Sequence, residues 1–222
     1  VVVGDVDPAV VQTRVEELFG GRAAGTLALP ELPREPARTD VAIAAQTRHS
    51  EATIVSFAWH APEVEDFDEV CAMDLIYTVL GEGRLGSLHS RLVESGTAVA
   101  VDVQYLTQRD PGLLIVTALT LPERETDART AIITEIERLR NETLSPEALE
   151  QAKRVLRIGY AFSNEAYADQ AGSLAFYEAL GDYRLAVDYI ERVNAVTPEL
   201  FQQVARKYLD PNAYTLVIIR PA

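Results

Sequence analysis

Runs of apolar residues divide the chain into short strands and longer helices. Strands are predicted where apolar residues alternate with polar ones or run together between turn residues. Six segments fit: Val1–Val3, Val41–Ala45, Thr53–Trp59, Thr97–Thr107, Gly112–Leu121 and Tyr214–Ile219. We expect the second and third of these to pair with each other. The fourth and fifth are expected to form a hairpin with its turn at Arg109–Gly112.

Helices are predicted where apolar residues recur every three or four positions. Three of them begin with a capping side chain followed by proline, a pair that favours the first helical turn: Asp7-Pro8, Ser145-Pro146 and Thr197-Pro198. Other apolar stripes predict helices at Phe67–Leu80, Ser87–Glu94, Ala128–Leu139, Leu174–Leu180 and Leu185–Val193. The segment at 67–80 is apolar on nearly every face, which is typical of a buried helix.

Strands in pairs, with helices grouped between them, predict an α+β fold with a mostly antiparallel sheet covered by helices on one face. Residues 22–39 keep no apolar period and contain Pro30, Pro33 and Pro36, which is typical of a linker. We therefore expect residues 1–21 to be the closing strand and helix of a preceding domain, cut from a longer protein. Residues 40–222 are expected to form the main domain.

Composition narrows the classes of partner. The 222 residues carry a net charge of −14, which argues against nucleic acid and anionic lipid, because both need basic patches. Cys71 is the only cysteine, so it forms no internal disulfide, and its apolar neighbours predict a buried thiol. No apolar run approaches the roughly 20 residues that span a bilayer. The compartment stays open between bacterial cytoplasm and periplasm.

The histidines do not have the spacing of a metal site. A helical zinc site places two histidines about one turn apart, whereas His49, His60 and His89 are widely separated. The segment from His60 gives H-x-x-E but ends in Val64, and Pro62 lies inside it. We therefore expect no metal ligand in this chain, and each histidine to be a surface or capping residue.

One glycine-rich segment, Gly81–Gly86, matches G-x-G-x-x-G. A dinucleotide-binding fingerprint follows a strand and opens a helix, but the residues before Gly81 are predicted to be helical. Glu82 would also place a negative charge where a pyrophosphate lies. A turn between two helices is therefore the expectation, and a nucleotide-binding enzyme is the alternative that depends on this loop alone.

Several stretches are similar, in their order and spacing, to one known family. They are Val1–Gly20, Phe57–Pro62, Leu80–Gly83, Ser90–Gly96, Ser163–Glu165, Gly181–Tyr183, Val196–Glu199 and Ala205–Pro211. Together they resemble the carboxy-terminal half of an insulinase/pitrilysin-type zinc metallopeptidase, the family that includes mitochondrial processing peptidase. The resemblance covers nearly the whole chain.

The resemblance implies a two-part protein. In that family two similar α+β halves form a clamshell, the first carrying zinc on an H-x-x-E-H helix and the second enclosing an extended peptide. The helix at 67–80 would occupy the place of the metal helix, yet Cys71–Leu75 contain no histidine or glutamate. The chain is thus expected to be the non-catalytic half, with zinc in an amino-terminal catalytic partner domain. An inactive scaffold homologue, like the core subunits of a respiratory complex, is the alternative.

The resemblance also suggests which residues contact substrate. Active members carry an Arg and a Tyr in this half that hold the peptide backbone, but the Tyr position here is Val99 and Arg91 is shifted from the Arg position. Arg84 and Arg91 are the candidate substrate-binding residues, through peptide carbonyls or carboxylates; no catalytic residue is assigned. Asp74, an acid in an apolar helix, is expected to be exposed at a seam or paired with an arginine. A homodimer through the exposed first strand is an additional expectation.

Overall fold

The computed structural model describes residues 1–23, 25, 33–81 and 83–222. Its strands form one sheet in the order β1-β5-β2-β4-β3. Their bounds are Ala42–Arg48 for β1, Thr53–His60 for β2, Ala100–Tyr105 for β3, Leu113–Thr120 for β4 and Thr215–Pro221 for β5. The β1–β5 pair is parallel and the other three pairs are antiparallel. The predicted α+β fold with a mostly antiparallel sheet is confirmed, as is the β3–β4 hairpin.

The longer helices follow the predicted order. They are α1 (Pro8–Phe19), α2 (Phe67–Gly81), α3 (Glu125–Asn141), α4 (Pro146–Phe162), α5 (Tyr167–Leu180), α6 (Arg184–Ala195) and α7 (Pro198–Tyr208). The three predicted caps are present, because the side chains of Asp7, Ser145 and Thr197 each accept a hydrogen bond from a backbone N–H in the first turn. Within the described residues, every helix is too short or too polar to cross a membrane.

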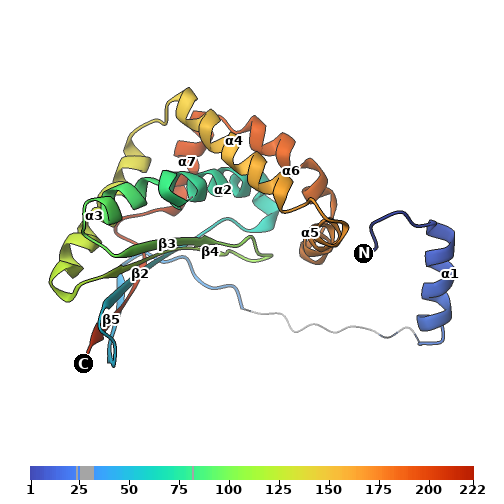
Figure 1. The fold of residues 1–222 in the computed structure, drawn as a ribbon, viewed down its shortest axis with the longest axis horizontal. Coiled ribbons are helices and arrows are strands. Elements are labelled where there is room, and N and C mark those ends of the chain that lie inside the picture. Colours follow the sequence, from blue (N-terminus) through green and yellow to red (C-terminus); the bar gives the residue numbers. More distant parts are fainter. Residues whose placement is uncertain (24, 26–32, 82) are drawn as a thin grey trace.

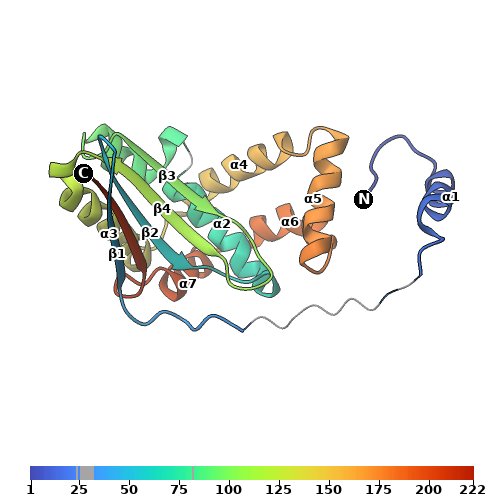
Figure 2. The ribbon, with the colours of Figure 1, turned by 90° about the horizontal axis from the view of Figure 1, so that it is seen from below.

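The sheet has one covered and one open face. Helices α2, α3, α4, α6 and α7 lie above it in Figure 1. Seen from below in Figure 2, the strands have no helix of the described chain in front of them. Apolar side chains reach this open face, among them Leu113 of β4 and Val217 of β5, both exposed.

Helix α2 forms the centre of the fold. Nine of its fifteen residues are buried, and they point in all directions around the helix axis. The helix packs against β3 on one side and against α4, α6 and α7 on the others. Its last residue, Gly81, lies so close to β3 that a Cβ there would come within 2.5 Å of the Val103 Cβ. The sequence-based prediction of a buried helix at this position is confirmed.

The predicted pairing of the first two strands of the main domain is wrong. Strand β5 lies between β1 and β2, parallel to the first and antiparallel to the second. The reason is burial: β1 is exposed along almost its whole length, whereas β5 points Leu216 and Ile218 into the core. The more apolar strand takes the inner position, and β1 becomes the edge.

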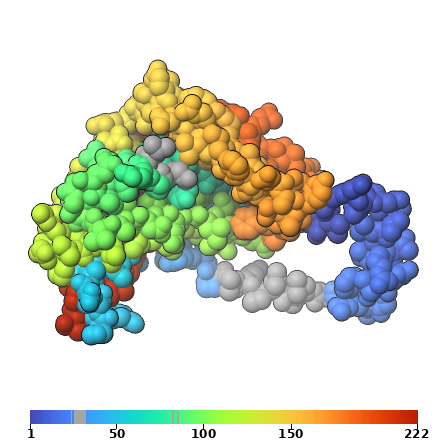
Figure 3. All heavy atoms as spheres, in the orientation of Figure 1, coloured from blue at the N-terminus to red at the C-terminus, as the bar shows by residue number. Residues whose placement is uncertain are grey.

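The amino-terminal segment stands apart from the main body (Figures 1 and 3). Helix α1 buries none of its residues, and the first residues meet the body beside Tyr167 at the start of α5. Val1–Val3, predicted as a strand, are not part of one. Much of the predicted linker, residues 24 and 26–32, lies outside the described residues. The division into 1–21, 22–39 and 40–222 stays a prediction.

Replacing Ile76 by Ala is expected to lower the free energy of unfolding by about 2–5 kcal/mol, the usual cost of emptying a buried aliphatic site. Ile76 is fully buried on α2. Urea unfolding measures this as a lower midpoint with an unchanged slope. The control is Val187→Ala on the exposed side of α6, which should change stability by less than about 0.5 kcal/mol. A similarly small effect of Ile76→Ala would mean that α2 is not the core.

Candidate functional site

The middle of α2 does not carry the ligand set of a zinc helix. Cys71, Ala72, Met73 and Leu75 are all fully buried and apolar or weakly polar, so this helix face cannot present a histidine-glutamate-histidine set to solvent. The three histidines lie in separate places: after β1, at the end of β2 and in a π-helical turn, His89–Glu94. In the part of the chain that the structure describes, no three His, Cys, Asp or Glu side chains gather closely enough to hold a metal ion. The described residues therefore do not fit zinc.

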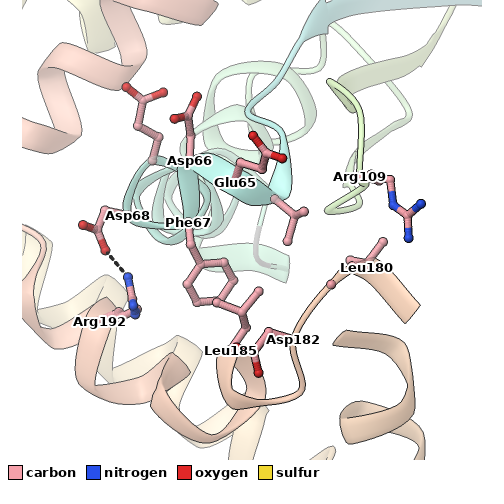
Figure 4. A pocket seen from close by; sticks show the side chains of 12 residues that line it. Glu65, Asp66, Phe67, Asp68, Arg109, Leu180, Asp182, Leu185 and Arg192 are labelled. Carbon is pink, nitrogen blue, oxygen red and sulfur yellow. Dashed lines mark hydrogen bonds and ion pairs between the residues drawn. The ribbon is translucent and has the colours of Figure 1, made fainter. Parts of the chain in front are cut away.

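A hollow of about 530 Å³ opens at the amino-terminal end of α2 (Figure 4). Carboxylates line it from three elements: Glu65 and Asp66 from the 3₁₀ turn Val64–Asp66, Asp68 from the start of α2, and Asp182 from the α5–α6 turn. A basic side chain balances part of the negative charge of these carboxylates. The Arg192 guanidinium donates to Asp68 at 2.9 Å and lies over the Phe67 ring. Arg109 also lines this hollow, although its guanidinium donates to the Ala179 carbonyl.

A second hollow of about 490 Å³ lies farther along α2, at Asp74. The Tyr189 hydroxyl of α6 donates to the Asp74 carboxylate at 2.7 Å. Burial raises the pKa of Asp74 to about 7, and the Tyr189 hydrogen bond opposes this shift only in part. The prediction that Asp74 would pair with an arginine if buried is wrong, because its partner is a phenol. Neither this partner nor the other aromatic residues of the hollow could be found from the sequence, since α6 follows more than a hundred residues later.

The two candidate substrate-binding arginines differ in their surroundings. Arg84 lies in the short 3₁₀ turn Gly83–Leu85, is exposed, and has no hydrogen bond or ion pair with the described residues. Arg91 lies in the π-helical turn and forms an ion pair with Glu135 of α3. Among the described residues Arg84 therefore has no partner, whereas Arg91 is held by Glu135.

Glu135 is the charged residue that sequence reasoning missed. It is fully buried within the apolar stripe of α3, and Arg138 of the same helix donates to it at 2.7 Å. Burial, the largest single effect, would raise the pKa of Glu135, but the hydrogen bonds that it accepts, from Arg138 above all, and the charges of Arg138 and Arg91 together outweigh burial, so the pKa is lowered. The spacing of Glu135 and Arg138 on one helix was a readable signal; the third member, Arg91, comes from far away in the sequence.

The glycine-rich segment and Val99 lie on either side of the π-helical turn in sequence. The glycine-rich segment at 81–86 follows helix α2 and not a strand, which contradicts a dinucleotide-binding loop. Glu82 lies outside the described residues. Val99, at the position where active family members have a tyrosine, is exposed just before β3. It brings no hydroxyl to that surface.

Replacing Glu135 by Gln is expected to lower stability at pH 7 by about 1.5–3 kcal/mol, the range for hydrogen bonds to charged groups. The folded-state pKa of Glu135 lies below its unfolded value. Its contribution is therefore present above the unfolded pKa and is lost as pH falls through the folded pKa. Urea midpoints measured from pH 7 down to pH 3 should fall less steeply for the variant than for the original chain.

Glu137→Gln is the matched control, because Glu137 is exposed on the same helix. It should follow the pH dependence of the original chain. Parallel curves for Glu135→Gln and the original chain would contradict an ionised, paired Glu135.

Comparisons with known proteins agree with this arrangement. Residues 1–156 match the model of the family described as the peptidase M16 inactive domain. A protease from Helicobacter pylori has a similar structure, with a TM-score of 0.90 and 22% identity, covering 99% of this chain and 54% of that one. The peptidase M16 inactive domain from Pseudomonas fluorescens gives 0.82 and 22%, covering 99% and 52%. No curated protein matches the sequence.

A chain of complex III2 from Candida albicans shares the fold as well. Its TM-score is 0.78 at 13% identity, and the alignment covers 98% of this chain and 53% of that one. At these identities the likeness to solved structures concerns the fold alone. The chain spans about half the length of each of these three relatives.

Proposed function

This chain belongs to the peptidase M16 inactive-domain family, and on that premise we propose that it is the substrate-enclosing half of a zinc-dependent endopeptidase. It is the non-catalytic part of that protein. The zinc and its chemistry belong to an amino-terminal half that carries the H-x-x-E-H helix. The partners of the chain are that half and an extended peptide.

The observation that carries this proposal is the burial of α2. By the family resemblance this helix takes the place of the metal helix, and apart from Asp74 its middle consists of apolar or weakly polar residues, most of them buried. A helix with this much buried apolar surface provides packing and does not provide a histidine-glutamate-histidine zinc set. The chain therefore contributes shape and binding surface to the assembled protein.

Two features support a partner domain. The open face of the sheet keeps apolar side chains such as Leu113 and Val217 in solvent, which is typical of a surface that meets another protein layer. In addition, the chain is about half as long as the relatives it matches. We propose that the catalytic half covers part of the apolar surface that this chain leaves exposed.

Arg84 and Arg91 remain the proposed contacts to the peptide. Arg84 is exposed and free to donate to a carbonyl or carboxylate. Arg91 keeps part of its guanidinium in solvent while it pairs with Glu135, so it offers fewer donors. The stronger contact is assigned to Arg84.

A scaffold function is the second candidate. The exposed Val99 replaces a tyrosine of active members, and the fold is shared with a chain of a respiratory complex. The sequence that precedes Val1 in the whole protein separates the two. An H-x-x-E-H motif followed by a further glutamate favours the peptidase, and loss of that motif favours the scaffold.

The purified chain is expected to bind no stoichiometric zinc and to hydrolyse no peptide, because its residues do not form a ligand set. Metal analysis after dialysis against zinc and a fluorogenic peptide assay measure the two properties. One tightly held zinc per chain would contradict the proposal.

In the same assay, the amino-terminal half is added to this chain and peptide hydrolysis is measured again. Peptide hydrolysis that requires both halves supports the endopeptidase. A stable complex of the two halves with no hydrolysis supports the scaffold.

A further inference from the structure

We propose that the hollow at Asp74 is a binding site for one basic side chain, a lysine or an arginine, of a polypeptide. We call it the Asp74 pocket. Its lining residues come from α2, from β3 and the residues after it, and from α4, α5 and α6; those used below are Asp74, Tyr105, Tyr160, Asn164, Asp169, Phe176, Tyr177 and Tyr189.

The first observation is a carboxylate without a cation. Three other buried or half-buried carboxylates are paired with basic side chains: Glu135 with Arg138, Glu125 with Arg220 at 2.6 Å, and Glu69 with Lys207 at 2.6 Å. No lysine or arginine is among the described residues that line the Asp74 pocket. Since an enclosed carboxylate is costly unless it is paired, a cation from another molecule would complete this site.

The second observation is the aromatic wall around the carboxylate. Rings from four elements line the pocket: Tyr105 of β3, Tyr160 of α4, Tyr177 of α5 and Tyr189 of α6, with Phe176 at the rim. The rings support one another, since the Tyr160 and Tyr189 centroids are 4.9 Å apart. Ring faces attract ammonium and guanidinium groups, and the attraction is stronger where water is excluded.

The polar groups of the pocket also suit a donor ligand. The buried Tyr105 hydroxyl has no hydrogen-bond partner among the described residues. Such a group gains by accepting from an incoming N–H donor. Asn164 and the exposed carboxylate of Asp169 lie at the rim. A volume of about 490 Å³ admits a long side chain with part of its backbone.

The pocket should bind a cation more weakly in acid. The groups that face Asp74 are Tyr105, Tyr177 and Tyr189, and burial raises the pKa of each, so these phenols stay neutral. Asp169 is the other charged lining residue, and no histidine lines the pocket in the described chain. Because the pKa of Asp74 is raised to about 7, its negative charge is lost just below neutral pH. A bound cation favours the ionised form.

This inference deepens the proposed function, in that the cation would belong to the enclosed peptide. It can fail separately, because binding is measured on this chain without the catalytic half. A negative result would leave the assembly and activity experiments above unaffected.

The experiment titrates the ¹⁵N-labelled chain with three probes: Nα-acetyl-lysine methylamide, Nα-acetyl-arginine methylamide and the uncharged Nα-acetyl-norleucine methylamide. We expect the amide signals of residues around Asp74 to shift with a basic probe and not with norleucine. The tighter of the two basic probes identifies the side chain. Absence of shifts with both basic probes, or equal binding of norleucine, overturns the proposal.

Substitutions of single aspartates test whether the Asp74 carboxylate is the group that binds the basic probe. Asp74→Asn keeps an acceptor for Tyr189 and should fold, and it should weaken the basic probe at least tenfold. Asp188→Asn removes a charge from the exposed side of α6 and should leave binding unchanged.

The pH dependence of binding is the second test. Between pH 8 and pH 6 the affinity of the original chain for the basic probe should fall about tenfold, as expected for one group with a pKa near 7. Asp169→Asn should show the same fall. Unchanged affinity in Asp74→Asn, or the same pH dependence in it, would overturn the assignment.

Discussion

Helix α2 is enclosed by the sheet below it and by the other helices around it, and the rest of the fold is arranged to keep it so. Its apolar residues point in every direction, so no single neighbour could cover them. Strand β3 approaches closely because Gly81 has no side chain. Helices α4, α6 and α7 close the remaining sides. An arrangement with this much apolar contact leaves little freedom to introduce polar ligands at the centre, since each would need a partner there.

The enclosed charges are treated in two different ways. Glu135 forms ion pairs with Arg138 of α3 and with Arg91 of the π-helical turn. It therefore links these two elements. Asp74, on the central helix, accepts a hydrogen bond from the Tyr189 phenol and has no cation beside it among the described residues. Glu135 is thus paired within the chain, whereas we propose that Asp74 takes its cation from another molecule. By this comparison Glu135 maintains the fold, and Asp74 is the carboxylate that we propose for binding.

Local features of the fold could be predicted from sequence, and distant ones could not. The caps at Asp7, Ser145 and Thr197, the β3–β4 hairpin and the buried α2 depend on neighbours a few residues away. The position of β5 between β1 and β2 depends on which strand buries more, which pairs residues far apart in the chain. The surroundings of Asp74 were missed for the same reason. Arg84 and Arg91 were selected by resemblance, and their substrate contacts remain proposals.

The inner position of β5 affects the order in which the domain can be completed. Residues 215–221 bridge β1 and β2, which are themselves joined by only a short loop. While this sequence leaves the ribosome, β2, β3 and β4 can associate, but β1 has no neighbour until the final strand arrives. Contacts between segments so distant in sequence form slowly. A nascent chain therefore exposes two unpaired strand edges for most of its synthesis, and loss of a few terminal residues would leave them exposed permanently.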